Sequence, residues 1–299
     1  MEPTHAIAGL SPMDTLRSKL LDYYTLTKPE VNLLILMTTS AGYYLASRGP
    51  FQFARFISTL LGTLLVASGT ATLNQFMERR YDAHMRRTAN RPLVAGRLSA
   101  REALWFGVLL SFAGGLQLAF AVNRLAALLA VSTLLGYLLI YTPLKRKTPL
   151  CTLLGAIPGA MPTLIGWAGA SARIDRPAWC LFAILFLWQF PHFLAIALMY
   201  REDYARAGFR MLPQFDVEGR FTKAEILIFT VVLVLTTMAP PAGRGAVLYL
   251  LLMFTAGVFF LYHTAELARS NSRVLAGHVV HASVIYLPVV LVIMMVWKP

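Results

Sequence analysis

The sequence NQFMERRYDAHMRRTANRPL, from Asn74 to Leu93, follows an uncharged apolar run that begins at Phe56. It gathers two acidic residues and five arginines within a short distance. A lipid-facing segment cannot carry so many charges, because each charged group is costly inside a bilayer. We therefore interpret this stretch as the point where a membrane-spanning helix reaches the membrane surface.

Three polar residues within this stretch recur every four positions: Asn74, Glu78 and Asp82. If the helix from Phe56 continues through them, they share one face at a spacing of roughly 6 Å, given about 1.5 Å of rise per residue. Carboxylates placed in this way can share a divalent cation. Hard ions such as Mg²⁺ take oxygen ligands and leave positions for phosphate oxygens. The pattern therefore predicts a metal and diphosphate site at the mouth of an apolar helix bundle.

The arginines of the same stretch would meet the rest of the phosphate charge. They are Arg79, Arg80, Arg86, Arg87 and Arg91. The alternative is a solvated turn, because a helix that leaves the bilayer on the cytoplasmic side normally meets positive charge. The depth of Asn74 favours the site, since Phe76 and Met77 follow it and polar groups in apolar surroundings are costly.

The composition indicates an all-α polytopic membrane protein. The 299 residues are 57% apolar and 14% charged, and the mean hydropathy is +0.61. Helices that cross the apolar core of about 30 Å need runs of this kind. We predict nine transmembrane helices in one bundle around a central cavity, at Val31–Ser47, Phe56–Met77, Ala103–Asn123, Leu125–Leu144, Thr148–Ala172, Pro177–Tyr200, Ile226–Gly243, Gly245–Ala265 and Val274–Trp297.

The expected organisation is an amphipathic cytoplasmic segment, residues 1–30, followed by one transmembrane domain, residues 31–299. Most of the 27 lysines and arginines fall in alternate loops, which places the N-terminus in the cytoplasm and the C-terminus outside. The expected location is the bacterial inner membrane. The net charge of +13 suits anionic lipid and phosphate, and no soluble basic domain exists to bind nucleic acid. Cys151 and Cys180 lie in apolar runs without C-x-x-C spacing, so we expect small core residues and neither a disulfide nor a metal pair.

Two further candidates stand where helices enter or leave the bilayer. The string YTPLKRKT places Tyr141 and Lys145 four residues apart, on one face at the cytoplasmic mouth. A tyrosine and a basic cluster also occur at ordinary span ends. Lys28, in LTKPEVNLLILMTT, is a candidate for substrate binding or an ordinary headgroup anchor.

The stretch LWQFPHFLAIALMYREDYARAGFRMLP carries the remaining candidates. His192 lies inside the apolar run, which favours a role in function, although a hydrogen-bonded structural histidine is at least as common as a ligand. Glu202 and Asp203 follow at the exit. We expect Asp203 to be a second metal or diphosphate contact facing Asp82; the alternative is that the two acids neutralise neighbouring arginines on a wet loop.

The pattern N-x-x-x-E-x-x-x-D formed by Asn74, Glu78 and Asp82 resembles the first aspartate-rich motif of the UbiA-like intramembrane prenyltransferases, in which the second residue is usually Asp. The strings RRTANRPLVAGRL, WQFPHF and DYARAGFRMLP resemble the heme-prenylating branch of that superfamily. The superfamily has a second D-x-x-x-D, but this chain has Ala207 four residues after Asp203. That departure disfavours the quinone-type branch.

The resemblance implies transfer of a farnesyl group from farnesyl diphosphate to a vinyl group of protoheme (heme B), giving heme O and diphosphate. It implies Mg²⁺ as cofactor, and as further partners the lipid bilayer and a downstream heme-modifying membrane enzyme. Prenylation of an aromatic acid or quinone precursor, and a non-catalytic transporter, remain as alternatives. The implied metal ligands are Asn74, Glu78, Asp82 and Asp203, joined in catalysis by Tyr141 and Lys145, with Lys28, Arg86, Arg91, Glu202 and His192 binding substrate.

Overall fold

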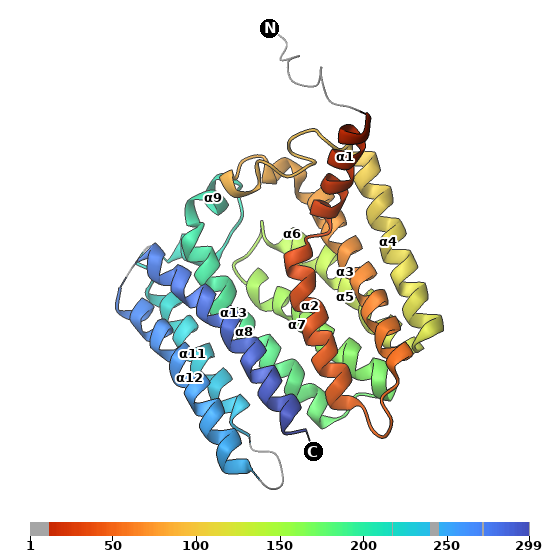
Figure 1. Cartoon of the computed structure of the whole chain (residues 1–299). Coiled ribbons are helices and arrows are strands. Elements are labelled where there is room, and N and C mark those ends of the chain that lie inside the picture. Colours follow the sequence, from red (N-terminus) through yellow and green to blue (C-terminus); the bar gives the residue numbers. More distant parts are fainter. Residues whose placement is uncertain (1–11, 217, 240–244, 271, 299) are drawn as a thin grey trace.

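The computed structural model describes residues 12–216, 218–239, 245–270 and 272–298, and within these ranges it contains helices and no strands (Figure 1). The predicted all-α class is therefore confirmed. The long helices are α1 (Pro12–Leu26), α2 (Pro29–Ala46), α3 (Phe53–Asp82), α4 (Ala100–Ala121), α5 (Arg124–Leu135), α7 (Cys151–Ser171), α8 (Arg176–Met199), α11 (Arg220–Thr237), α12 (Ala246–Arg269) and α13 (Arg273–Val296). The short ones are η1 (Arg86–Thr88), η2 (Gly136–Tyr141), α6 (Thr142–Leu144), α9 (Arg201–Arg206) and α10 (Leu212–Phe215).

Seven helical segments in the described part of the chain are long and apolar enough to cross a membrane, counting α5, η2 and α6 as one. They define a multi-pass membrane protein. Helices α2 and α11 coincide with the other two predicted spans, but they begin with polar residues, Glu30 and Asn32 in α2 and Arg220, Lys223 and Glu225 in α11. A count of nine crossing helices is therefore not confirmed, and the predicted end of the seventh span, residues 240–243, lies outside the described residues.

Helix α3 runs without interruption from Phe53 to Asp82, as the sequence predicted. It lies along α4, and Gly69 allows the close approach, because a Cβ there would be 2.7 Å from the carbonyl oxygen of Gly107. The C-terminal turns of α3 extend beyond this contact. There they carry Asn74, Glu78 and Asp82 toward the short helix α6.

The apolar core lies where α8 and α13 pack together, with α2 and α7 on one side and α11 and α12 on the other (Figure 1). Trp188, Phe260 and Tyr286 are among its fully buried side chains. Both cysteines are free. Cys151 is buried, as expected of a small core residue, but the same expectation is wrong for Cys180, which is exposed on α8. This core holds the C-terminal part of α8, which carries His192, whereas α3 packs mainly against α4.

Helix α1 lies outside the bundle, next to the start of α4 (Figure 1). Arg97 bonds Asp22 at 2.9 Å, and Lys19 pairs with Glu102 at 2.6 Å. Several apolar side chains of α1 are exposed, namely Leu16, Leu20, Leu21 and Tyr24, whereas Leu26 at its end is buried. These features suit the predicted helix at the membrane surface, although residues 1–11 of the predicted segment lie outside the described residues.

Candidate active site

The polar face at the end of α3 is buried. Asn74, Glu78 and Asp82 are 1%, 5% and 1% exposed. A solvated turn would leave such side chains in water, so that alternative is wrong for these three residues. Buried carboxylates need partners, because a buried charge without compensation is strongly unfavourable.

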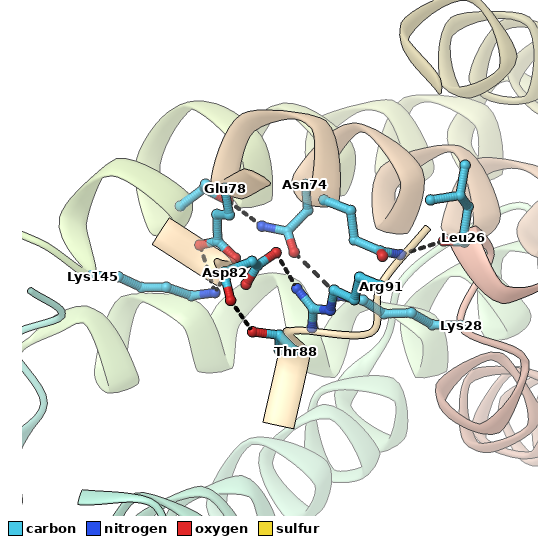
Figure 2. A network of polar contacts seen from close by, with 10 residues as sticks. Leu26, Lys28, Asn74, Glu78, Asp82, Thr88, Arg91 and Lys145 are labelled. Carbon is cyan, nitrogen blue, oxygen red and sulfur yellow. Dashed lines mark hydrogen bonds and ion pairs between the residues drawn. The ribbon is translucent and has the colours of Figure 1, made fainter. Parts of the chain in front are cut away.

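Three cations from three other segments supply those partners (Figure 2). Lys145 Nζ donates to both oxygens of Glu78, at 2.9 and 3.3 Å. Arg91 forms an ion pair with Asp82. Lys28 Nζ donates to the Asn74 side-chain oxygen at 3.1 Å. The result is a compact cluster of two carboxylates, one amide and three cations.

Lys28 reaches the cluster from the bend between α1 and α2. Its backbone is left-handed, with φ of 52° and ψ of 65°, a conformation that costs a non-glycine residue about 1–2 kcal/mol. Pro29 follows directly and begins α2. Burial, and then the nearby cations Arg91 and Lys145, lower the pKa of Lys28 to about 7. Strained backbone and a perturbed lysine together are typical of a functional site.

Lys145 reaches the cluster from a segment of π-helix. The chain leaves α5 through η2, a single π-helical turn, and continues as α6. Such turns occur often at functional sites, because the extra residue rotates the side chains that follow. Thr142, at the start of α6, accepts a hydrogen bond from Asn74 at 3.2 Å. The Lys145 ammonium lies 4.6 Å from the centre of the Tyr141 ring, so these two residues share a face as predicted.

Arg91 reaches the cluster from the loop after α3. The Thr88 hydroxyl donates to the Asp82 carbonyl oxygen at 2.7 Å and ties η1 back to the end of the helix (Figure 2). This bond folds the loop over the carboxylates. The arginine-rich extension of the sequence motif thus brings one of its five arginines into direct contact with the acidic face.

The residues present fit a divalent cation such as Mg²⁺. The Asp82 Oδ1 atom is buried and has no hydrogen-bond partner, which leaves a carboxylate oxygen available as a ligand. Glu78 and Asn74 add oxygen donors of the kind that Mg²⁺ prefers. With Lys28 protonated, the three cations exceed the two carboxylates by one positive charge, and a bound Mg²⁺ would increase this excess. The cluster can therefore receive a strongly negative group such as a diphosphate.

Asp203 lies close to this cluster without joining it. It is 9% exposed, pairs with Arg206 three residues away, and accepts from the Arg87 backbone N–H at 3.4 Å. The same loop thus contacts Asp82 through Thr88 and Asp203 through Arg87. No group of three or more acidic, histidine and cysteine side chains converges in the described part of the chain. The structure places Asp203 beside the Asp82 loop and shows no direct contact between the two carboxylates.

The remaining sequence candidates lie away from the cluster. Glu202 pairs with Arg273, and both side chains are more than 60% exposed. Arg86 is exposed, and Arg87 stacks 5.3 Å from the centre of the Tyr200 ring. His192 contacts Ser283 on α13.

Sequence reasoning missed the neutral groups that support the cluster, except Asn32, for which it left open a place facing the bundle or one at the membrane surface. Gln75 donates to the Leu26 carbonyl at 2.8 Å, and Asn32 donates to the Ser68 hydroxyl at 2.9 Å. Both bonds hold the bend that carries Lys28 against α3. Gln75 stands beside Asn74 in an apolar run, and that placement was the available signal. Thr142 and Thr88 gave no signal, because threonine is common at helix ends.

Comparison with known proteins shows the family to which this chain belongs. The model of the UbiA prenyltransferase family matches residues 35–295, and the chain belongs to that family. A protein named protoheme IX farnesyltransferase from Solibacter usitatus is 46% identical over 288 residues, covering 93% of this chain and 99% of the relative. One of the same name from Koribacter versatilis is 41% identical over 295 residues, covering 95% of each.

Solved structures share the fold. One described as a digeranylgeranylglyceryl phosphate synthase superposes with a TM-score of 0.75 at 19% identity, covering 94% of this chain and 99% of that chain. A UbiA homolog from Archaeoglobus fulgidus, solved bound to DMAPP and Mg²⁺, gives a TM-score of 0.68 at 14% identity and covers 91% and 99%. The family resemblance drawn from the sequence motifs is confirmed.

Proposed function

We propose that this protein transfers a farnesyl group from farnesyl diphosphate to a vinyl carbon of protoheme, giving heme O and diphosphate. The observation that carries the chemistry is the buried face of Asn74, Glu78 and Asp82, with a free Asp82 oxygen among three cations. The identity of 40–46% to several protoheme IX farnesyltransferases over nearly their full length supports the acceptor.

The proposed donor site has two parts with different tasks. Asn74, Glu78 and Asp82 would hold Mg²⁺, which supplies Lewis-acid stabilisation of the leaving diphosphate. In the structure these three side chains are bonded to cations, at hydrogen-bonding or ion-pair distance: Lys28, Arg91 and Lys145. When the metal satisfies the carboxylates, the cations are available for the phosphate oxygens. Each cation then exchanges one anionic partner for another without leaving the cluster.

The proposed reaction breaks the bond between C1 of the farnesyl chain and the diphosphate oxygen. Lys145 and Arg91 stabilise the negative charge that develops on this oxygen, in a site with little water. The vinyl carbon of heme bonds to the allylic C1, which leaves positive charge on the carbon next to the macrocycle. Addition of water and loss of a proton neutralise that carbon. The Tyr141 ring packs against the Lys145 ammonium, 4.6 Å from the ring centre, and would hold it in this position during the reaction.

Asp203 is proposed as a second contact for the metal or the diphosphate. This proposal is supported by the hydrogen bond that Asp203 accepts from the Arg87 backbone N–H, because Thr88 in the same loop bonds Asp82. Closure of this loop over a bound diphosphate would bring Asp203 and Arg206 nearer to the cluster. The two residues act in this proposal as the outer rim of the site.

The proposed location is the bacterial inner membrane, with the N-terminus and the site in or facing the cytoplasm. The uneven distribution of lysine and arginine between alternate loops supports this orientation. Cysteines introduced at Arg86, Lys147 and Arg206 should resist an impermeant thiol reagent in intact cells and react after permeabilisation. Labelling of any of them from the periplasmic side would invert the topology.

The deciding experiment uses the purified, detergent-solubilised protein with protoheme, farnesyl diphosphate and Mg²⁺. Mass spectrometry should find a farnesylated heme that is absent when Mg²⁺ is chelated. Parallel reactions replace protoheme with 4-hydroxybenzoate, an aromatic acid. Prenylation of the aromatic acid but not of heme would transfer the proposal to the quinone-type reaction, and product in neither would leave a binding or transport role.

A further inference from the structure

His192 is held in one orientation by residues of α8 and α13. Its Nδ1 atom lies 2.7 Å from the Ser283 hydroxyl oxygen. Its ring stacks on Trp188, with 4.7 Å between centroids and 18° between planes. Trp188 in turn donates through Nε1 to the Ser283 carbonyl oxygen at 2.7 Å. One serine on α13 therefore positions both aromatic rings on α8.

The hydrogen bonds at Ser283 also fix where the imidazole carries its proton. The Ser283 hydroxyl donates its single hydrogen to the Val280 carbonyl oxygen at 2.6 Å. It is therefore an acceptor toward His192, and the hydrogen between them belongs to Nδ1. The neutral ring then carries its free lone pair on Nε2. Metal-ligating histidines share this arrangement, in which the second nitrogen donates to a fixed neighbour.

The surroundings of His192 differ from those of the other described histidines. Trp188 and Ser283 are 1% and 0% exposed, whereas the His192 ring between them is only partly buried. Trp188 covers one face of the ring and Ser283 its Nδ1 edge, and the ring is not fully enclosed. The other described histidines are exposed or lie beside an acidic residue: His84, His278 and His281 are exposed, and His263 lies 3.8 Å from Glu266.

We propose that His192 binds the iron of the heme substrate through Nε2, with Ser283 as its positioning residue. This inference rests on the proposed function, because heme enters it as the acceptor. Iron ligation would set the porphyrin plane across the Nε2–iron axis. Only rotation about that axis then remains to select which vinyl group meets the farnesyl carbon.

The depth of His192 suits this task. A helix rises about 1.5 Å per residue, so His192 lies about 10 Å along α8 from its end at Met199, next to α9 and Asp203. Asn74 lies about 12 Å along α3 from its end at Asp82. The heme ligand and the inner edge of the diphosphate site thus stand at comparable distances from the ends of their helices. The reacting carbon of the farnesyl chain is the one bonded to the diphosphate. The vinyl edge of heme must therefore lie next to the diphosphate site.

The first test is a heme titration of the purified protein, followed by Soret absorbance and electron paramagnetic resonance. The wild type should show an imidazole-ligated heme. His192→Ala should lose this signature and bind heme at least about tenfold more weakly. Added imidazole should restore the signature in His192→Gly. His281→Ala, an exposed histidine on α13, is the matched control and should behave as the wild type does.

The second test separates ligation from simple packing. Metal-free protoporphyrin IX has the same shape as heme but no iron, so His192→Ala should weaken heme binding and leave protoporphyrin binding unchanged. Equal weakening of both would mean that the ring only packs, and would overturn the inference. Ser283→Ala should keep the histidine ligand but shift the iron–histidine stretching frequency in resonance Raman spectra. An unchanged frequency would remove Ser283 from its positioning role.

The outcomes for ligation and for prenyl transfer can be separated. Farnesylated heme from the wild type, together with an unchanged heme spectrum in His192→Ala, would overturn the ligation and leave the proposed function standing. Loss of the imidazole signature in that variant supports the ligation. If the wild type binds heme through His192 yet forms no farnesylated product, the transfer fails and the heme site stands.

Discussion

The acidic residues of α3 and those of α9 look alike in sequence but have different environments. Glu78 and Asp82 are buried, and the cations that meet this face come from the α1–α2 bend, the η1 loop and the residue after α6. Glu202 is exposed and pairs with the exposed Arg273, while Asp203 pairs with a residue one helical turn away. The difference shows that ion pairs largely buried on both sides identify a site, whereas ion pairs with an exposed arginine do not.

The largest expected effect is at Asp82, because its substitution tests directly whether the buried acidic face of α3 holds a metal. Asp82→Asn keeps the shape of the side chain and removes the charge that a metal needs. Prenyl transfer at saturating substrate should fall by about 10²–10³-fold, as when a transition-state stabilising group is lost. The measurement is the rate of farnesyl-heme formation, with heme binding as the control for folding. Activity near that of the wild type at limiting Mg²⁺ would contradict the metal role.

Substitution of Lys145 should have the second-largest effect. A double variant separates its role in stability, as the partner of Glu78, from its role in turnover. Lys145→Gln leaves Glu78 buried without its cation, which should lower stability by about 3–5 kcal/mol. Lys145→Gln combined with Glu78→Gln should recover most of that stability, because no unpaired charge remains, but neither variant should regain turnover. Thermal unfolding in detergent and the transfer rate measure the two effects. Recovery of activity in the double variant would reduce Lys145 to a structural partner of Glu78.

Asp203 should show a smaller and more specific effect. Asp203→Asn should raise the Mg²⁺ concentration needed for half-maximal activity by a few-fold, because the residue lies on the rim. The test is a Mg²⁺ titration of the transfer rate at fixed farnesyl diphosphate. An unchanged half-saturating concentration would assign Asp203 to its ion pair with Arg206 alone.

Substitution of Glu202 should have the smallest effect, and it serves as the matched control for substitution of Asp203. Glu202→Gln breaks a pair that is exposed on both sides, and such pairs contribute about 0–1 kcal/mol. Stability and Mg²⁺ dependence should both remain close to those of the wild type. A shift in the Mg²⁺ titration as large as that of Asp203→Asn would show that the whole α9 acidic pair belongs to the site.

The sequence by itself determined the helical membrane class and the identity of the acidic face. Composition alone demands helices that satisfy their own backbone in lipid, and a four-residue spacing places Asn74, Glu78 and Asp82 on one side of α3. These are local consequences of helix geometry. The same reasoning paired Tyr141 with Lys145, four residues apart, and the structure shows them together.

Only the tertiary structure decided which cations reach that face and which acids do not belong to it. Lys28 and Lys145 stand 46 and 67 residues from their partners Asn74 and Glu78, and no periodicity links positions so far apart. Their approach depends on a left-handed backbone at Lys28 and on a π-helical turn before Lys145, both of which are sustained by packing around them. The Ser283 contact that orients His192 likewise arises because α8 and α13, distant in sequence, pack side by side.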